Sequence, residues 1–352
     1  MLHDIIFLIL GLVLIILGGN WVTDGAVTVA QKLKVSSLVI GLTVVAFGSS
    51  APDFVVCLSS TLQGKSEMAL GDVVGSNIFD ILLVTGIVAL IKPIQVSNEM
   101  VSKDLPMLAL SSFALFFCGD DMLFDGTADF ISRTDGLLLL AFFAIFMAYT
   151  MEMAKDQRLA PHSSAPSGNF AQTVGNATIG AVHGQKGVAP KADYPPVTAR
   201  QLWIALLKIA AGLAALIIGG NWIVSGASGI ALKAGMSEGL VGLTIVAFGS
   251  AAPDLATSLT AALKHQPSIA LGNLVGSCIF NVYFCLGFCA VVRPLNAGSV
   301  SLVDFAVLAG GSVLLWLFGR RWGRNTILRW EGALLILAYL AYLAYLISQL
   351  KH

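Results

Sequence analysis

Two aspartates stand directly after prolines inside stretches that are otherwise as apolar as hydrocarbon. One stretch, VVAFGSSAPDF, contains Asp53, and the other, VAFGSAAPDL, contains Asp254. Proline has no N–H to donate, and its ring crowds the preceding turn, so a helix must open at Pro52 and at Pro253. A carbonyl freed in hydrocarbon must be satisfied by protein, water or an ion. The two stretches therefore predict paired sites where carbonyls and a carboxylate meet a cation.

Hydroxyl groups accompany both aspartates at helical spacing. Ser49 and Ser50 lie four and three residues before Asp53, and Ser250 lies four residues before Asp254. Residues three or four apart share one face of a helix. Hard cations such as calcium bind about six to eight oxygen ligands of this kind. Each motif therefore predicts an oxygen-rich helix face.

The apolar segment that follows each motif adds a second oxygen pair. Ser76 lies four residues before Asp80, and the copy has Ser277 four residues before Asn281. Lys and Arg are absent from the middle of all four segments. Unpaired carboxylates in a membrane are costly and mark ion or proton pathways. We expect the three carboxylates to bind cations or protons.

The chain that positions these residues reads as a membrane protein. Its 352 residues are 57% hydrophobic and 11% charged, far from the composition of a soluble domain. Apolar runs of about 17–25 residues, the length that crosses a bilayer, recur along it. We expect an all-α membrane protein with ten transmembrane helices, at about residues 5–30, 37–62, 68–91, 105–119, 136–154, 202–232, 239–263, 269–292, 302–318 and 330–348. The fourth run is short and could extend into 101–104.

The two halves of the chain are copies. At an offset of 201 residues, 24 of the 53 positions in 41–93 are identical to those in 242–294, far above the tenth or so expected from shared apolar composition. Five crossings in each half make the repeats inverted, as in many secondary transporters. We expect repeats at 1–154 and 201–352, joined by a flexible Gly-, Pro- and Ser-rich linker at 155–200.

The charge distribution orients the chain in its membrane. With the N-terminus outside, fourteen Lys and Arg residues fall on the inner side and five on the outer side. This asymmetry fits the positive-inside rule, and it predicts a cytoplasmic linker and two outer termini. The first segment has no basic n-region and no cleavage site, so we expect no removable signal peptide.

Other polar and reactive residues have structural interpretations. Asp24 and Asp72 lie near segment ends, where a structural or vestibule role is expected. The five cysteines lie in or beside apolar segments without a CxxC, and we expect small buried hydrophobes. Glycines at 71, 75, 272 and 276 predict close helix approach. A Gly-rich phosphate loop is absent, which argues against a nucleotide-driven pump.

The quoted motifs resemble those of a known family. GLTVVAFGSSAPDF with ALGDVVGSNIFDIL, and GLTIVAFGSAAPDL with ALGNLVGSCIFNVY, resemble the two alpha-repeats of the calcium/cation antiporter superfamily, specifically its prokaryotic sodium/calcium exchanger branch. The resemblance spans both halves. It implies the exchanger fold, a location in the cytoplasmic membrane, and helices 5–30 and 202–232 sliding across a stiffer core.

The resemblance also implies a set of ion ligands. Sodium and calcium would be the transported ions, with the lipid bilayer as the surroundings, no cofactor, no enzymatic activity and no nucleic-acid partner; the oligomeric state stays open, and a monomer is compatible. By position, the ligands would be the carbonyls of Ala46 and Ala247, the hydroxyls of Ser49, Ser50, Ser76, Ser250 and Ser277, the acids Asp53 and Asp254, and the central pair Asp80 and Asn281.

Several departures from the family pattern bear on ion choice. The branch usually has Glu after the proline, whereas both copies here have Asp, and Ala251 stands where a hydroxyl is expected. Cys278 stands where Asn is common. Sodium-driven calcium extrusion is the leading hypothesis, and proton-coupled cation exchange is the alternative. A potassium requirement stays open, while an intramembrane aspartyl protease, which would need GxGD, and a passive channel are disfavoured.

Overall fold

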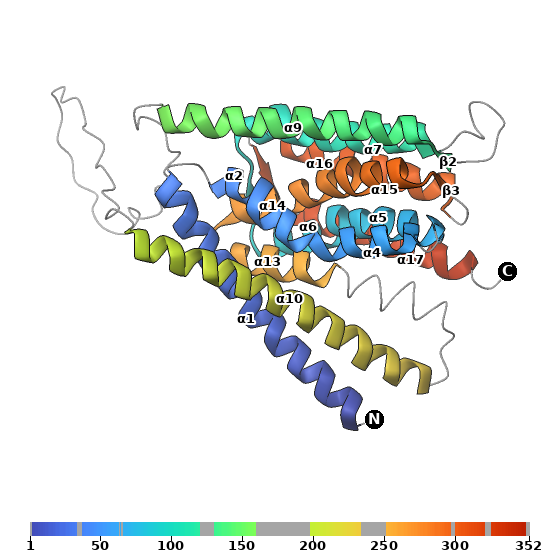
Figure 1. Ribbon diagram of the computed structural model, residues 1–352, viewed down its shortest axis with the longest axis horizontal. Helices are drawn as coiled ribbons and strands as arrows, with labels where there is room; N and C mark the ends of the chain where they lie inside the picture. The colour runs from blue at the N-terminus through green and yellow to red at the C-terminus, as the bar shows by residue number, and fades with distance from the viewer. Residues whose placement is uncertain are drawn as a thin grey trace.

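The computed structural model describes residues 2–33, 37–62, 64, 66–119, 130–159, 198–233, 251–296, 300–320 and 325–349 (Figure 1). This part of the chain is helical apart from four two-residue strands and short turns. The α-helices are α1 (Leu2–Leu33), α2 (Ser37–Ile40), α3 (Ala46–Ser49), α4 (Ala51–Leu62), α5 (Ser66–Ile78), α6 (Thr85–Ile91), α7 (Leu105–Gly119), α9 (Arg133–Leu159), α10 (Ala199–Lys233), α13 (Ala252–Leu263), α14 (Pro267–Ile279), α15 (Gly287–Val292), α16 (Leu302–Arg320) and α17 (Arg329–Gln349).

Four π-helical segments continue or interrupt these helices. They are η1 (Gly41–Val45), η2 (Phe79–Val84), η3 (Met100–Asp104) and η5 (Phe280–Leu286). Two antiparallel ribbons complete the described elements: β1 (Ile94–Gln95) pairs with β4 (Thr326–Ile327), and β2 (Phe130–Ile131) pairs with β3 (Leu295–Asn296).

Eight helices in the described part are long and apolar enough to cross a membrane. They correspond to eight of the ten expected crossings, with ends shifted by at most five residues, except that the crossing expected at 202–232 corresponds to Ala199–Gly219. The fourth crossing does extend, because η3 continues into α7 and gives a span of Met100–Gly119. The second crossing is broken into α2, η1, α3 and α4. The seventh, expected at 239–263, is described only from residue 251, where α13 forms its end.

The expected linker boundaries need a small correction. Helix α9 continues to Leu159 and helix α10 begins at Ala199, so residues 155–159 and 199–200 are helical. The apolar pattern ends before the helix does, because the last turns of α9 are charged and need no lipid contact. Residues 160–197 lie outside the described part.

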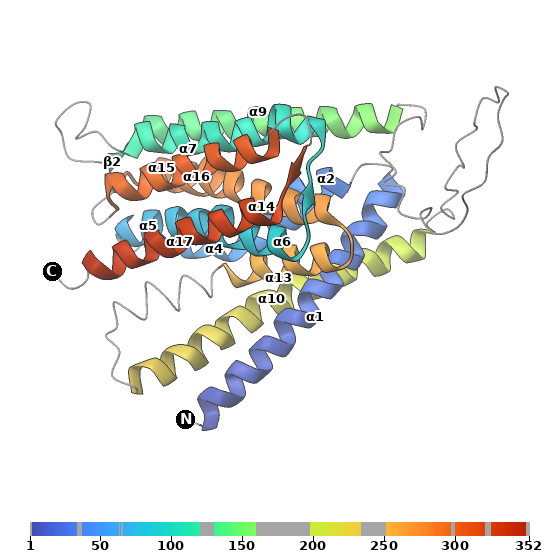
Figure 2. The same ribbon diagram turned by 180° about the vertical axis from the view of Figure 1, so that it is seen from behind.

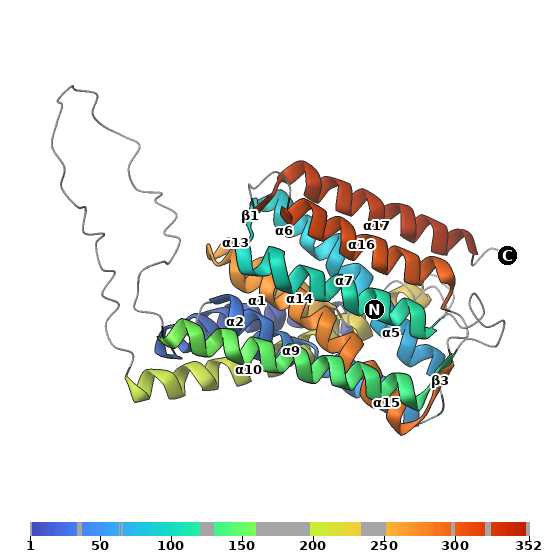
Figure 3. The same ribbon diagram turned by 90° about the horizontal axis from the view of Figure 1, so that it is seen from above.

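The two halves reuse the same elements. The run α5–η2–α6 and the run α14–η5–α15 are 201 residues apart and have matching boundaries. The paired strands are also copies: β1 matches β3, and β2 matches β4. Figure 3 shows β1 and β3 at opposite ends of the bundle, as an inverted arrangement requires.

Helices α1 and α10 pack against each other and slant away from the rest of the bundle (Figures 1 and 2). A Cβ atom on Gly18 would lie 2.8 Å from the carbonyl oxygen of Gly212, so glycine is needed for this crossing. Helix α1 also packs on α13. The first helix of each half thus forms one pair that borders the central helices.

Helices α4, α5, α13 and α14 with η1, η2 and η5 form the centre of the molecule. Glycines allow their close approach, because a Cβ atom on Gly272 would lie 2.9 Å from the carbonyl oxygen of Leu38. On Gly276 it would lie 2.7 Å from the Cβ of Ala46. The expected role of these two glycines is therefore confirmed. The counterparts of those partners, around 239–247, lie outside the described residues, so the roles of Gly71 and Gly75 stay predictions.

Candidate ion-binding site

The central helices bring together the acidic and amide residues expected from the motifs. Asp53, Asp80 and Asn281 are fully buried, and Asp254 is 1% exposed. They come from α4, η2, η5 and α13. In the described part of the chain, no Lys or Arg forms an ion pair with any of these carboxylates. The centre of an apolar bundle therefore holds three carboxylates that have no basic partner among the residues that the structure describes.

Local breaks in both motif helices set the directions of Asp53 and Asp254. Ser50 forms a turn between α3 and α4, with φ −86° and ψ 0°, and Ala251 precedes α13 with φ −85° and ψ −4°. The N–H of Ser50 still bonds the carbonyl of Ala46 at 3.0 Å. In the first motif the expected opening at Pro52 is thus a one-residue interruption, whereas the residues before Ala251 lie outside the described part. Each Asp then lies in the first turn of a new helix.

A π-helical turn holds each member of the central pair. Asp80 lies in η2 and Asn281 lies in η5. The hydroxyl of Thr85 donates to the carbonyl oxygen of Asp80 at 2.8 Å, five residues away. Single π-turns inside α-helices are rare and are frequent at functional sites. The extra residue per turn re-aims the side chains of Asp80 and Asn281 relative to a regular helix.

Asp53 and Asn281 connect the two halves directly. The amide Nδ2 of Asn281 donates to Oδ2 of Asp53 at 3.0 Å and lies 3.3 Å from Oδ1 of Asn77. Asn77 in turn donates through Nδ2 to the carbonyl oxygen of Cys278 at 3.1 Å. One oxygen of Asp53 is therefore bonded across the repeat boundary.

Asp254 has two donors on a single oxygen. Ser277 Oγ and Asn273 Nδ2 each donate to Asp254 Oδ1 at 3.0 Å. Ser49 lies beside this group, with its Oγ 3.4 Å from Ser277 Oγ. A carboxylate that accepts charge-assisted hydrogen bonds is held in one orientation.

Other oxygen atoms of the site have no hydrogen-bond partner among the described residues. They are Asp53 Oδ1, both carboxylate oxygens of Asp80, and Ser50 Oγ. Buried polar atoms are nearly always paired in native structures, and a buried carboxylate without a partner is especially costly. Bound cations are partners that oxygens of this kind accept.

The chemistry of the ligand set favours a hard cation. Within the described ranges, no three His, Cys, Asp or Glu side chains converge as a ready metal cage. A cation here would therefore complete its shell with hydroxyl, amide and carbonyl oxygens, as Na⁺ and Ca²⁺ do. Their role as transported substrates fits this mixed set.

The remaining expected ligands are partly accounted for. Ser76 Oγ donates to the carbonyl oxygen of Val73 at 3.2 Å, which leaves its lone pairs available. The carbonyl oxygen of Ala46 accepts from the Ser50 N–H at 3.0 Å and lies 3.2 Å from Ser49 Oγ, whose single proton has nearer acceptors, at 3.0 Å, in the Val45 carbonyl oxygen and Asn273 Oδ1. Two expected ligands, Ala247 and Ser250, lie outside the described residues.

Sequence reasoning missed the amides next to the carboxylates. Asn273 and Asn77 were not among the expected ligands, yet both bond to site residues. A signal was available, because Asn273, Ser277 and Asn281 are spaced four apart on one helix face. The spacing argument for Ser277 and Asn281 extends one turn further back.

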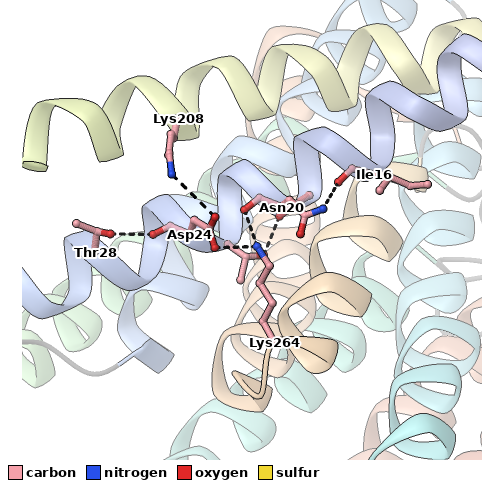
Figure 4. Close-up of polar contacts among 8 residues, drawn as sticks. Ile16, Asn20, Asp24, Thr28, Lys208 and Lys264 are labelled. Atoms are coloured by element: carbon pink, nitrogen blue, oxygen red, sulfur yellow. Dashed lines mark hydrogen bonds and ion pairs between the residues drawn. The ribbon is translucent and has the colours of Figure 1, made fainter.

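Asp24 lies outside this group and is paired. Lys264, at the end of α13, donates to Asp24 Oδ1 at 2.7 Å and to the carbonyl oxygen of Asn20 at 3.2 Å. Lys208 of α10 lies 4.0 Å from Asp24 Oδ2 (Figure 4). This contact joins α1, α10 and α13, which fits the structural role expected of Asp24. Four of the five cysteines, Cys57, Cys278, Cys285 and Cys289, are buried free thiols as expected, whereas Cys118 is partly exposed.

A helical membrane bundle with unpaired carboxylates from two copies of one motif at its centre defines a secondary cation transporter. The sequence matches the profile of the sodium/calcium exchanger protein family over residues 3–151 and 204–348, and the chain belongs to this family.

Individual relatives span nearly the whole chain. The putative antiporter CaxA of Alkalimonas amylolytica is 34% identical over 351 residues, which cover 99% of this chain and 100% of that one. The sodium/calcium exchanger MaX1 of Methanosarcina acetivorans is 29% identical over 349 residues, 96% of each chain. A solved structure of the sodium-calcium exchanger NCX_Mj, soaked with 10 mM Na⁺, matches with a TM-score of 0.76 at 28% identity and covers 97% of this chain and 98% of that one. The resemblance in the motifs and the all-α exchanger fold are confirmed.

Proposed function

We propose that this protein exchanges Na⁺ for Ca²⁺ across the cytoplasmic membrane by alternating access and extrudes calcium. The observation that carries the proposal is the set of unpartnered buried oxygens of Asp53, Asp80 and Ser50. These oxygens need positive charge, and no basic side chain in the described part supplies it. The names of MaX1 and NCX_Mj, both sodium/calcium exchangers, support the same ions.

The charge of the site explains why transport would be an exchange. Three buried carboxylates are costly to enclose when no cation neutralises them. One divalent cation or several sodium ions lower this cost, so only a loaded site would pass through the enclosed state. An inward sodium gradient would then drive calcium outward.

The pair α1 and α10 is the element we expect to move. The two helices pack against each other at Gly18 and Gly212, and the pair contacts α13 of the site helices. Sliding of this pair would open the site to one side at a time, while the central helices keep the ligands together. Orientation follows from the Lys and Arg distribution, with both termini outside and residues 155–200 on the cytoplasmic side.

The test is radiolabelled calcium uptake into proteoliposomes preloaded with sodium. Potassium-loaded and proton-loaded vesicles are the controls, and Asp53→Asn is the inactive variant. We expect uptake only with internal sodium and none in Asp53→Asn. Uptake driven only by a proton gradient would replace sodium coupling by proton coupling, and sodium-dependent uptake in Asp53→Asn would refute the site assignment.

A further inference from the structure

Asn273 lies within hydrogen-bond distance of four polar side chains around Asp254. It is fully buried in α14. Its Nδ2 donates to Asp254 Oδ1 at 3.0 Å and lies 3.1 Å from both Thr257 Oγ1 and Ser258 Oγ. Its Oδ1 accepts from Ser49 Oγ at 3.0 Å. One amide therefore joins helices α3, α13 and α14 around a carboxylate.

The chemistry of its neighbours fixes the orientation of this amide. Asp254 can only accept hydrogen bonds when it is ionised, so the NH₂ group must face it. The hydroxyl of Thr257 donates to the carbonyl oxygen of Pro253 at 2.8 Å, which leaves Thr257 as an acceptor for Asn273. A flipped amide would oppose Oδ1 to the carboxylate. Only one arrangement satisfies both ends of the side chain.

The equivalent position in the first half is Asp72, a carboxylate where the second half has an amide. The two motif aspartates accordingly accept hydrogen bonds from amides in different halves. Asp254 takes its amide from Asn273 in its own half, whereas Asp53 takes its amide from Asn281 across the repeat boundary. Asp53 and Asp80 keep unpartnered oxygens, and Asp254 Oδ1 has two donors.

We propose that Asn273 is a positioning residue that sets the cation affinity of the exchanger. It holds Asp254 and the Ser49 hydroxyl in fixed directions, so that a cation meets them already oriented. Preorganised ligands spend less free energy on ordering when they bind. This inference rests on the exchange proposed above, and it assigns a role to a residue outside the ligand set that the family motif implies.

The test compares Asn273→Ala with the isosteric Asn273→Asp. The second variant keeps the shape and the acceptor for Ser49, but it presents a carboxylate oxygen to Asp254 in place of a donor. The readouts are the half-saturating calcium concentration and the maximal rate of sodium-dependent uptake. A hydrogen bond to a charged group predicts a rise in half-saturation on the order of tenfold to a hundredfold in both variants, with the maximal rate within about threefold of the wild type.

Ser312→Ala is the matched control. Ser312 is also fully buried, and its Oγ bonds Ser112 Oγ at 2.6 Å between α7 and α16 and lies 2.9 Å from the carbonyl oxygen of Leu308, with no hydrogen bond to a site carboxylate among the described residues. We expect its half-saturation to equal that of the wild type. Equal half-saturation in Asn273→Asp and the wild type would mean that Asn273 only fills space, and a loss of maximal rate alone would also overturn the inference.

Two further measurements distinguish a failure of the proposed exchange from a failure of the role proposed for Asn273. Wild-type uptake is measured first, because its failure refutes the proposed exchange and leaves the role of Asn273 to be judged by binding alone. The rise in Tm with added calcium, measured in detergent, reports that binding without transport. The Asn273→Asp variant should need at least about tenfold more calcium than the wild type for the same rise in Tm. A calcium dependence of Tm equal to that of the wild type would refute the inference. If Asn273→Ala does not fold, the isosteric variant decides.

Discussion

The hydroxyl of Ser50 lowers the stability of the fold and is a candidate cation ligand. It is fully buried, and its hydroxyl has no partner among the described residues. An unpaired buried hydroxyl costs about 1–3 kcal/mol. Such a cost is understandable if a transported cation takes the oxygen as a ligand.

Removing this hydroxyl should therefore have opposite effects on stability and binding. We expect Ser50→Ala, measured without sodium or calcium, to be about 1 kcal/mol more stable than the wild type, with a higher Tm. The same variant should need more calcium or sodium for half-maximal exchange. A variant with lower Tm and unchanged ion dependence would show that the hydroxyl has a structural partner instead.

The element that sequence could not predict is the π-turn. Apolar run length predicts that residues 66–91 and 267–292 are helices, and the duplication identifies Asp80 and Asn281 as equivalent. The bond from Thr85 to the carbonyl of Asp80 has no such signature in the sequence. A threonine four or five residues after Asp80 is compatible with an α-helix and with a π-helix alike. The direction of Asp80 is set by this turn, so it could not be derived in advance.

Substitution of Thr85 tests the turn. Thr85→Val keeps the shape and removes one of two donors to the Asp80 carbonyl oxygen, which also accepts the backbone N–H of Thr85, at a cost of about 1 kcal/mol of stability. We expect the half-saturating calcium concentration to rise as well, because Asp80 loses its fixed direction. Thr150→Val is the control: Thr150 makes a 2.8 Å bond to the Phe146 carbonyl in regular helix α9. Equal effects of both variants on exchange would contradict a special role for η2.

The contact between Asp24 and Lys264 joins helix α1, which we expect to move, to the end of the central helix α13. It ties α1 to the end of α13, and both side chains are partly exposed, Lys264 at 30% and Asp24 at 45%. Exposed ion pairs contribute about 0.2–1 kcal/mol. This energy would stabilise the arrangement of helices described here over one in which α1 has slid.

Breaking this pair should change the exchange rate modestly. Lys264→Gln is expected to alter the rate of sodium-dependent calcium uptake by up to about fivefold, with the difference shrinking at high salt. Lys208→Gln is the control, because its nitrogen lies 4.0 Å from the carboxylate and should matter less. Wild-type rates at every salt concentration would show that α1 moves without breaking the contact.

At the scale of the whole molecule, sequence predicted most of the fold. The duplication at 41–93 and 242–294 predicted the inverted repeat, and helical spacing predicted which helix faces carry oxygens. The contacts between the two halves could not be predicted from the sequence. The bond from Asn281 to Asp53 joins residues 228 apart, and no periodicity within one helix encodes which residue lies opposite in another.

Because the enclosed site is negatively charged, we expect calcium efflux to require a transported cation on the opposite side of the membrane. Calcium should leave loaded proteoliposomes when the outer solution contains sodium or calcium, and it should leave negligibly into a solution of a large organic cation. The reason is that an unneutralised cluster of three carboxylates is costly to enclose. Comparable efflux into all three solutions would indicate a channel-like leak and refute alternating access.

Equivalent residues of the two halves touch each other along the centre of the molecule. Ser112 Oγ bonds Ser312 Oγ at 2.6 Å, and Asn77 bonds the carbonyl of Cys278, its copy at an offset of 201. A residue that meets its own copy is the mark of an isologous dimer interface. Such contacts are those that a five-crossing chain would make with a second copy inserted in the opposite orientation, so the two halves of this chain meet as the subunits of a symmetric dimer would.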